Sequence, residues 1–354
     1  LPDIEQIKES FQTVFKKVWL GQVENDGFNQ LVIKAHLDWK EIMLLRAYYL
    51  YLRQTGATFS QAYVEKTLHS NPKISMLLVA LFEQKFNPKK TVSEDVLANQ
   101  SGLILAEIEQ VASLDEDRIL RRYLNLIQAT VRTNYYQEKV DSKGVPFISF
   151  KLNPALISDL PSPRPTFEIF VYSPRVEGVH LRGGAVARGG LRWSDRKEDF
   201  RTEVLGLMKA QMSKNAVIVP TGAKGGFIVK RPLDGLSRDE MMTEVVDCYS
   251  IFIGALLGIT DNLKGEKLIP PKKVVRYDAD DPYLVVAADK GTATFSDIAN
   301  GLAQEQGFWL GDGFASGGSV GYDHKKMGIT AKGAWESVKR HFREMGVDTQ
   351  SMPF

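Results

Sequence analysis

The sequence predicts an α/β domain, with a mixed, partly parallel sheet and flanking helices, preceded by an all-α helical region. Three observations support this prediction. Apolar residues recur at helical spacing in the first third, short β-branched and aromatic runs follow, and strands then alternate with helices. We therefore expect a helical region over residues 1–133 and an α/β domain over residues 134–354.

The helical region begins with apolar residues at three- and four-residue steps. Asp38 is expected to cap a helix that stops at Gly56, and Ser60 to open the next. The pairs Asn71-Pro72 and Asn87-Pro88 break the pattern. Further helices are expected over residues 72–86, 93–111 and 115–133. We interpret their apolar stripes as core packing.

The second part of the chain changes period after Asn134. Strands are short and rich in β-branched and aromatic residues, and longer segments at helical spacing follow them from residue 199. The expected strands are 146–152, 167–174, 176–183, 216–222 and 283–289, and the expected helices are 199–215, 237–258, 295–307 and 330–346.

Composition excludes several classes of protein. The 45 basic and 43 acidic residues leave a net charge of +2, which gives no bulk attraction to nucleic acid or to a membrane surface. The single cysteine, Cys248, excludes an internal disulfide and fits a reducing compartment. No signal pattern is present, and we see no apolar run near the roughly 20 residues of a membrane span. We expect a cytoplasmic protein and, without an initiator methionine, a piece of a longer one.

A stretch over residues 181–230 combines paired glycines with cations. Lys224 follows an apolar run in PTGAKGGF, where flanking glycines leave its ammonium close to bare backbone. A lysine at the end of a buried strand is a candidate for proton exchange with a substrate. A nucleotide phosphate loop would need Ser or Thr after the lysine, but Gly225 stands there. A purely structural turn remains the alternative.

Other charged residues are expected at the same edge of the sheet. Arg188 precedes Gly189-Gly190 and could fork onto a carboxylate, while Lys214 ends a helix and could bind a second one. Either could alone be a surface cation. Asp289 ends a predicted strand and could shuttle protons with Lys224, or could instead cap the next helix.

The glycine-rich segment 311–333 is not a dinucleotide fingerprint. Gly311 and Gly313 are followed by Gly317, one residue late for Gly-x-Gly-x-x-Gly. The histidines are scattered without the spacing of a metal site, so we expect no metal.

Several motifs together resemble a known family. RGGLRW followed by EVLGLMKAQMSKNAVIVPTGAKGG is similar to the substrate-domain signature of glutamate dehydrogenases. ADKGTATFSDIAN and GFASGGSVGYDHKKMGITAKGAWESVKRHF resemble the large NAD-specific bacterial type, over about residues 145–346. The resemblance implies oxidative deamination of L-glutamate to 2-oxoglutarate and ammonium, with NAD as cofactor, in a homo-oligomer.

The resemblance also implies residue roles. Lys224 matches the catalytic lysine that polarises the carbonyl and activates water, and Asp289 matches the aspartate that moves protons on the amino group. The matched binding residues are Lys214 for the α-carboxylate, Arg188 with Gly189 and Gly190 for the side-chain carboxylate, and Thr330 for the nicotinamide carboxamide. Arg188 stands where the small hexameric enzymes have lysine.

Two alternatives stay open. A related dehydrogenase for an apolar amino acid would share the α-carboxylate site but would have an apolar residue in place of Arg188. A non-catalytic module would use the apolar stripes of residues 1–133 for oligomer contacts or regulation. In the family a nucleotide-binding Rossmann domain follows the helix that ends near Gly346, so we expect this piece to bind NAD poorly and not to turn over alone.

Overall fold

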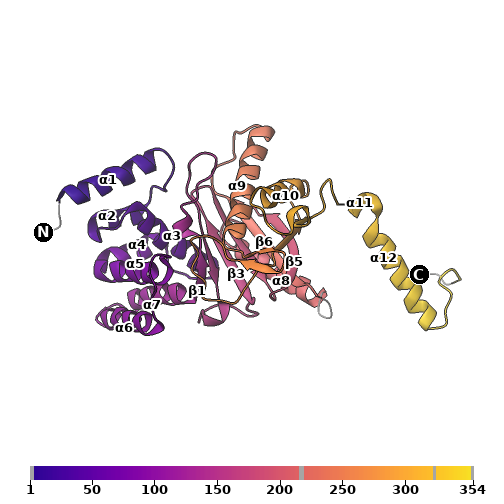
Figure 1. Ribbon diagram of the computed structural model, residues 1–354, viewed down its shortest axis with the longest axis horizontal. Helices are drawn as coiled ribbons and strands as arrows, with labels where there is room; N and C mark the ends of the chain where they lie inside the picture. Colours follow the sequence, from indigo (N-terminus) through magenta and orange to yellow (C-terminus); the bar gives the residue numbers. More distant parts are fainter. Residues whose placement is uncertain (1–3, 215–218, 322–323, 352–354) are drawn as a thin grey trace.

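The computed structural model describes residues 4–214, 219–321 and 324–351, which form helices packed on both faces of a sheet (Figure 1). Within them the sheet has eight strands in the order β1-β2-β3-β4-β6-β5-β9-β10. Pairing is antiparallel from β1 to β6 and parallel from β6 through β5 and β9 to β10. This confirms the predicted mixed, partly parallel sheet. The strands are β1 (Thr130–Thr133), β2 (Ile148–Leu152), β3 (Phe167–Tyr172), β4 (Val176–Arg182), β5 (Ala187–Trp193), β6 (Thr221–Val229), β9 (Val285–Ala288) and β10 (Ala315–Ser316).

The helical region contains the predicted helices with the predicted starts. Asp38 and Glu41 form a reciprocal capping box at the start of one helix, and the Ser60 hydroxyl accepts a hydrogen bond from the Tyr63 amide at another. Pro72 occupies the first turn of the next, where its missing amide costs nothing. The helices are α1 (Ile4–Trp19), α2 (Leu31–Lys34), α3 (Trp39–Gln54), α4 (Gln61–Ser70), α5 (Pro72–Phe86), α6 (Glu94–Ile108) and α7 (Leu114–Ala129).

The last predicted helix of this region, 115–133, is too long by one turn. Helix α7 ends at Ala129, and the β-branched run that follows forms β1, paired with β2. The Lys85 ammonium donates to three carbonyls at this junction, those of Ile127, Gln128 and Thr130. A cation at a helix C-terminus satisfies carbonyls that have no partner within the helix.

The sheet separates two hydrophobic cores. Helices α3 to α7 and α8 (Phe200–Lys214) pack on one face, which we call the α8 face. Helices α9 (Arg238–Gly258) and α10 (Ser296–Glu305) pack on the other, the α9 face. The ring of Tyr48 stacks on that of Phe150 with centroids 4.4 Å apart, so the helical region and the sheet share one core. The boundary at residue 133 stays a prediction, and it falls within this shared core.

Helix α9 corrects the expectation that no apolar run is near the length of a membrane span. Among the described residues it is long and apolar enough to cross a membrane by length and composition. More than half of its apolar window is buried, and Phe252 packs against the sheet where Gly178 leaves room. A core helix passes the same test, which is how we interpret α9.

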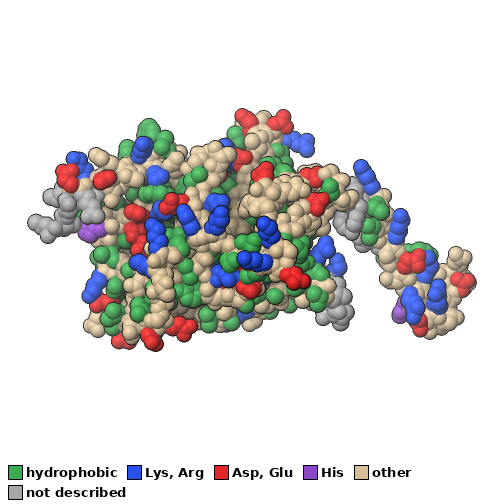
Figure 2. Space-filling view, in the orientation of Figure 1, with side chains coloured by type: hydrophobic (Ala, Val, Ile, Leu, Met, Phe, Trp, Pro, Cys, Tyr) green, Lys and Arg blue, Asp and Glu red, His purple; other side chains and the backbone are tan. Residues whose placement is uncertain are grey.

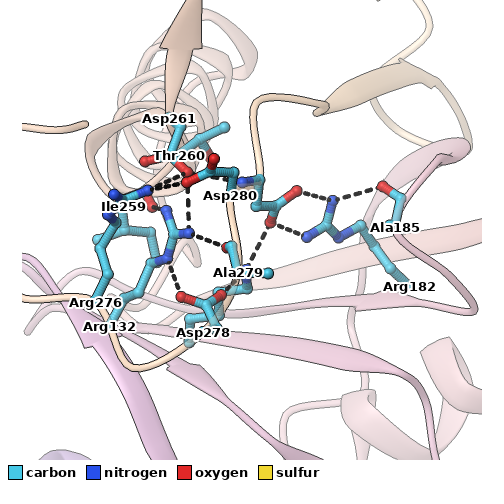
Figure 3. Close-up of polar contacts among 12 residues, drawn as sticks. Arg132, Arg182, Ala185, Ile259, Thr260, Asp261, Arg276, Asp278, Ala279 and Asp280 are labelled. Atoms are coloured by element: carbon cyan, nitrogen blue, oxygen red, sulfur yellow. Dashed lines mark hydrogen bonds and ion pairs between the residues drawn. The ribbon is translucent and has the colours of Figure 1, made fainter. Parts of the chain in front are cut away.

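A buried ionic cluster ties the segment 259–283 to the α9 face (Figure 3). Arg132 binds Asp261 at 3.0 Å and Asp278 at 2.6 Å, and its remaining hydrogen bonds go to carbonyls of the same segment. Arg182 and Lys151 both bind Asp281. Since β9 begins four residues after Asp281, the cluster fixes where that strand enters the sheet.

Helix α12 (Ile329–Glu344) extends away from the rest of the molecule, after the short α11 (His324–Met327) (Figure 1). Figure 2 shows Lys and Arg side chains interspersed with Asp and Glu side chains over the visible face. This mixture is what the near-zero net charge predicts.

Candidate active site

Three neighbouring parallel strands, β6, β5 and β9, form the floor of the candidate site. Leu191 pairs with Gly225 on one side and with Ala288 on the other, so Gly190 lies beside Lys224. Residue 289 follows β9 directly and lies level with Arg192 in this register. The topology therefore brings residues that are far apart in sequence to one edge of the α8 face.

Lys224 lies inside a strand, contrary to the sequence prediction. We predicted a strand over residues 216–222 with Lys224 in the loop after it, but the described strand is β6, and residues 216–218 lie outside the described part. The glycines of β6 leave room for helix α8. A Cβ on Gly226 would come within 2.5 Å of Val204, and one on Gly222 within 2.8 Å of the Met212 amide nitrogen.

The two glycines before Leu191 are required for different reasons. A Cβ on Gly189 would lie 1.6 Å from the Ala223 carbonyl oxygen, so a side chain there would separate β5 from β6. A Cβ on Gly190 would lie 2.8 Å from the Asp289 Cβ and 3.1 Å from the Lys224 ammonium. Both glycines pair with β9, Gly189 with Val286 and Gly190 with Ala287. Their predicted role in binding the side-chain carboxylate stays a prediction.

The Lys224 ammonium donates to Asp289 Oδ2, and this ion pair is the centre of the site. The two side chains are only 13% and 17% exposed. Asp289 Oδ1 accepts from the Lys290 amide at 2.8 Å, and the Asp289 amide donates to the Thr292 hydroxyl, which in turn donates to the Leu191 carbonyl. Asp289 is thus fixed to β5 by its own turn. It does not cap α10, whose N-cap is Phe295.

The carboxylate of Asp289 is stabilised in its charged form. Burial alone would raise its pKa, but the hydrogen bonds from Lys224 and the Lys290 amide, with the nearby Arg192, outweigh burial and lower the pKa below its usual value. The carboxylate is therefore ionised and carries no proton before a substrate binds.

Sequence analysis missed Arg192, Glu203 and Ser194. Arg192 Nη2 lies 3.4 Å from Asp289 Oδ1, and its Nη1 donates to Glu203 Oε1 at 2.8 Å. The Ser194 hydroxyl donates to the other oxygen of Glu203 at 2.6 Å. The signal was present in RGGLRW, because alternate residues of a strand share a face, which puts Arg188, Gly190 and Arg192 together. We did not predict a strand there because paired glycines are unusual in strands.

For the predicted binding residues the structure gives positions on strands and helices, not contacts in the site. Arg188 lies two residues before Gly190 on the same face of β5, about 7 Å along the strand, and its side chain is exposed. Lys214 is exposed at the end of α8, next to residues 215–218, which the structure does not describe. Thr330 is in the first turn of α12, and its side chain lies outside the described part of the chain. The roles of these residues stay predictions.

The site carries excess positive charge. Arg192 and Lys224 contact the two carboxylates of Asp289 and Glu203, and Arg188 lies on the same face of β5. An exposed guanidinium on a strand that also carries part of the Lys–Asp site suits a substrate that brings a carboxylate and an exchangeable proton.

Comparison with known proteins identifies the family. Residues 103–354 match the model of the bacterial NAD-glutamate dehydrogenase catalytic domain, and residues 23–88 match that of glutamate dehydrogenase helical motif 3. The NAD-specific glutamate dehydrogenase of Pseudomonas aeruginosa is 60% identical over 98% of this chain. Those of Halomonas elongata and Mycobacterium tuberculosis are each 57% identical, over 99% and 97% of it.

The chain spans only 22% of the length of each of these three relatives. The matched catalytic-domain model nevertheless extends over more than two thirds of the 354 residues, and it contains the whole candidate site. The chain therefore belongs to the bacterial NAD-glutamate dehydrogenase family.

Proposed function

We propose that the protein containing this chain oxidises L-glutamate to 2-oxoglutarate and ammonium, with NAD as hydride acceptor. The observation that carries the proposal is the Lys224–Asp289 pair, set against Gly190 on a parallel-strand edge. Such a pair offers both an acidic and a basic group within reach of one substrate atom. Family membership supplies the substrate class.

The substrate would lie along β5 on the α8 face. Arg188 would bind the side-chain carboxylate through its exposed guanidinium, and Lys214 the α-carboxylate. Gly190 would let the substrate lie close to the strand, and Gly189 would keep β5 close to β6. This arrangement brings the amino group toward Asp289 and the α-carbon toward Lys224.

The residues present move protons. Asp289 Oδ2 would accept a proton from the substrate ammonium and later return one to the departing ammonia. Lys224 Nζ would donate a hydrogen bond to the oxygen that water brings to the α-carbon, stabilising the negative charge that develops there. Overall, glutamate, NAD and water give 2-oxoglutarate, ammonium, NADH and a proton.

This chain supplies one predicted contact to the dinucleotide. The sequence contains no Gly-x-Gly-x-x-Gly turn, and Thr330 is the single residue that the resemblance assigns to the nicotinamide. The steps above therefore concern substrate binding and proton transfer alone, and NAD in the proposal rests on the family.

The test is glutamate-dependent NADH formation by the complete protein that the gene encodes. We expect activity in the wild type and its loss in Asp289→Asn, which keeps the shape but cannot accept the proton. A wild type that forms no NADH with glutamate would refute the proposal. Activity retained in Asp289→Asn would refute the assignment of the base.

A dehydrogenase for an apolar amino acid is the competing enzyme hypothesis. Under our proposal Arg188→Ala raises KM for glutamate strongly, while Lys214→Ala raises KM for glutamate and for leucine alike. If Arg188→Ala leaves glutamate unaffected, the apolar substrate is favoured.

We further propose that the protein is a cytoplasmic homo-oligomer. Support for self-association comes from α1, where Phe11, Phe15 and Trp19 are 48%, 61% and 81% exposed at four-residue spacing. The single buried Cys248 suits a reducing compartment. Light scattering of the complete protein and of Phe15→Ser/Trp19→Ser tests the first point, and an unchanged mass in the double variant would exclude this face. Cell fractionation tests the second.

A further inference from the structure

We propose that Arg192 is a positioning residue that holds the Asp289 carboxylate by one oxygen, so that the other oxygen faces Lys224. This inference rests on the proposed glutamate oxidation. It assigns a role to the arginine of RGGLRW that follows from its contacts in the fold.

The two oxygens of Asp289 have different partners. Oδ1 accepts from the Lys290 amide at 2.8 Å and lies 3.4 Å from Arg192 Nη2. Oδ2 contacts Lys224. Because the backbone amide and the guanidinium both lie on the Oδ1 side, the carboxylate cannot rotate without losing both contacts. Oδ2 is thereby the oxygen left to exchange a proton.

Arg192 is itself held from the other side. Its Nη1 donates to Glu203 Oε1 at 2.8 Å, and Glu203 Oε2 accepts from the Ser194 hydroxyl at 2.6 Å. Burial alone would raise the Glu203 pKa, but the hydrogen bonds from Ser194 and Arg192 outweigh it and lower the pKa. Glu203 therefore stays ionised and keeps the guanidinium in place.

This chain of contacts joins three elements. Glu203 is in the first turn of α8, Arg192 is on β5, and Asp289 follows β9. Arg192 and Glu203 are 19% and 17% exposed, so solvent screens these contacts only partly. Helix α8 also carries Lys214 at its far end, which links the predicted α-carboxylate residue mechanically to the base.

A substrate-binding role is the alternative that a test has to separate. Arg192 Nε is buried and has no hydrogen-bond partner among the described residues, so it is one further donor near the site. The other two nitrogens are occupied by carboxylates. By contrast, Arg188 is exposed and has no hydrogen bond or ion pair recorded in the described part of the chain.

The experiment measures NADH formation by the complete protein as a function of glutamate and pH. For Arg192→Met we expect kcat to fall about 10- to 100-fold, with KM for glutamate within about 3-fold of wild type. The acid limb of the kcat profile should move to higher pH by on the order of one unit, because a cation is removed from the carboxylate. Arg192→Lys should restore the limb but only part of kcat, since a lysine cannot fork between two carboxylates.

Two further variants complete the design. Glu203→Gln removes the anion that holds the Arg192 guanidinium but leaves the positive charge of Arg192 in place. It should lower kcat less than Arg192→Met does. Arg196→Gln is the matched control, because Arg196 is a nearby exposed arginine whose side-chain hydrogen bonds within the described residues go to Asp199. It should leave kcat, KM and the pH profile unchanged.

Two outcomes overturn the inference. If Arg192→Met raises KM more than 10-fold with unchanged kcat, Arg192 is a substrate-binding residue. If its kinetics are unchanged, Arg192 has no role in the reaction. Thermal unfolding checks that each variant is folded. If Arg192→Met is unfolded, Glu203→Gln provides the test. A loss of kcat in that variant supports the inference, and an unchanged kcat contradicts it. A wild type inactive on glutamate would instead refute the proposed function, so the two failures are distinguishable.

Discussion

Two ionic groups on opposite faces of the sheet lie in opposite settings, the Lys224–Asp289 pair on the α8 face and the Arg132 cluster on the α9 face. On the α8 face, Lys224 and Asp289 are 13% and 17% exposed. On the α9 face, Arg132 and Asp261 are 0% exposed (Figure 3). All three guanidinium nitrogens of Arg132 have protein acceptors, whereas the Lys224 ammonium has Asp289 as its single hydrogen-bond partner among the described residues.

The difference shows what distinguishes a structural ion pair from one that can take part in proton transfer in this fold. A fully buried pair held by several hydrogen bonds cannot change its protonation without a large loss of stability. A pair with access to solvent can exchange a proton when a substrate arrives. Substitutions in the Lys224–Asp289 pair and in the Arg132 cluster should therefore differ in what they damage, activity in the first and stability in the second.

The largest expected effect is that of Lys224→Met on activity. Removing the ammonium should lower kcat for glutamate oxidation by about 10³- to 10⁴-fold, while the midpoint of thermal unfolding changes little because the side chain has a single partner. Steady-state kinetics and thermal unfolding of the complete protein measure both. A large loss of stability in this variant would contradict the comparison.

Arg132→Met should show the opposite result. It removes the fully buried partner of Asp261 and Asp278, which keep only Arg276 and Lys151 as cations among the described residues, and the free energy of unfolding should fall by about 3–5 kcal/mol. In the molecules that remain folded, kcat should stay within a few-fold of wild type. Urea unfolding and activity per folded molecule test this. If kcat falls with unchanged stability, the cluster has a role beyond holding the segment 259–283.

Gly190→Ala should damage activity without unfolding the sheet. The added Cβ meets the Asp289 Cβ at 2.8 Å and must displace the carboxylate from Lys224. A displacement of this kind costs on the order of 10²-fold in kcat. The matched control is Gly102→Ala in α6, where a Cβ meets nothing within 4 Å. Equal kinetics for the two variants would show that the pair tolerates displacement.

The sequence allowed prediction of those features that depend on local pattern. Asp38 and Ser60 cap helices as their spacing indicated. Asp289 lies beside Lys224 as we expected, although Lys224 lies inside β6 and not at the end of a strand. The strand containing Arg192 was missed, because glycine weakens the strand signal and its need for close packing is visible only once α8 and β6 are in place. The Arg132–Asp261 contact joins residues 129 apart, and no local pattern specifies such pairing.

The smallest effect expected on either face is the pH dependence of stability contributed by Asp281. Burial alone would raise its pKa, but Arg182 and Lys151 outweigh burial and lower it to about 2. An unfolded aspartate titrates near 3.9, so the folded carboxylate binds its proton less readily than the unfolded one. Its stabilisation is therefore complete above about pH 4 and disappears as the pH falls toward 2.

Asp281→Asn removes this contribution and tests its size. The stability difference between wild type and variant should be about 2 kcal/mol larger at pH 7 than near pH 2. Urea unfolding at both pH values measures it, with Asp234→Asn as control because Asp234 is exposed and forms no ion pair with another described residue. Since Asn cannot titrate, a difference that does not change with pH would mean that Arg182 and Lys151 stabilise the segment without favouring the charged form of Asp281. The cluster would then resemble an ordinary polar contact, and the contrast between the two faces would rest on burial alone.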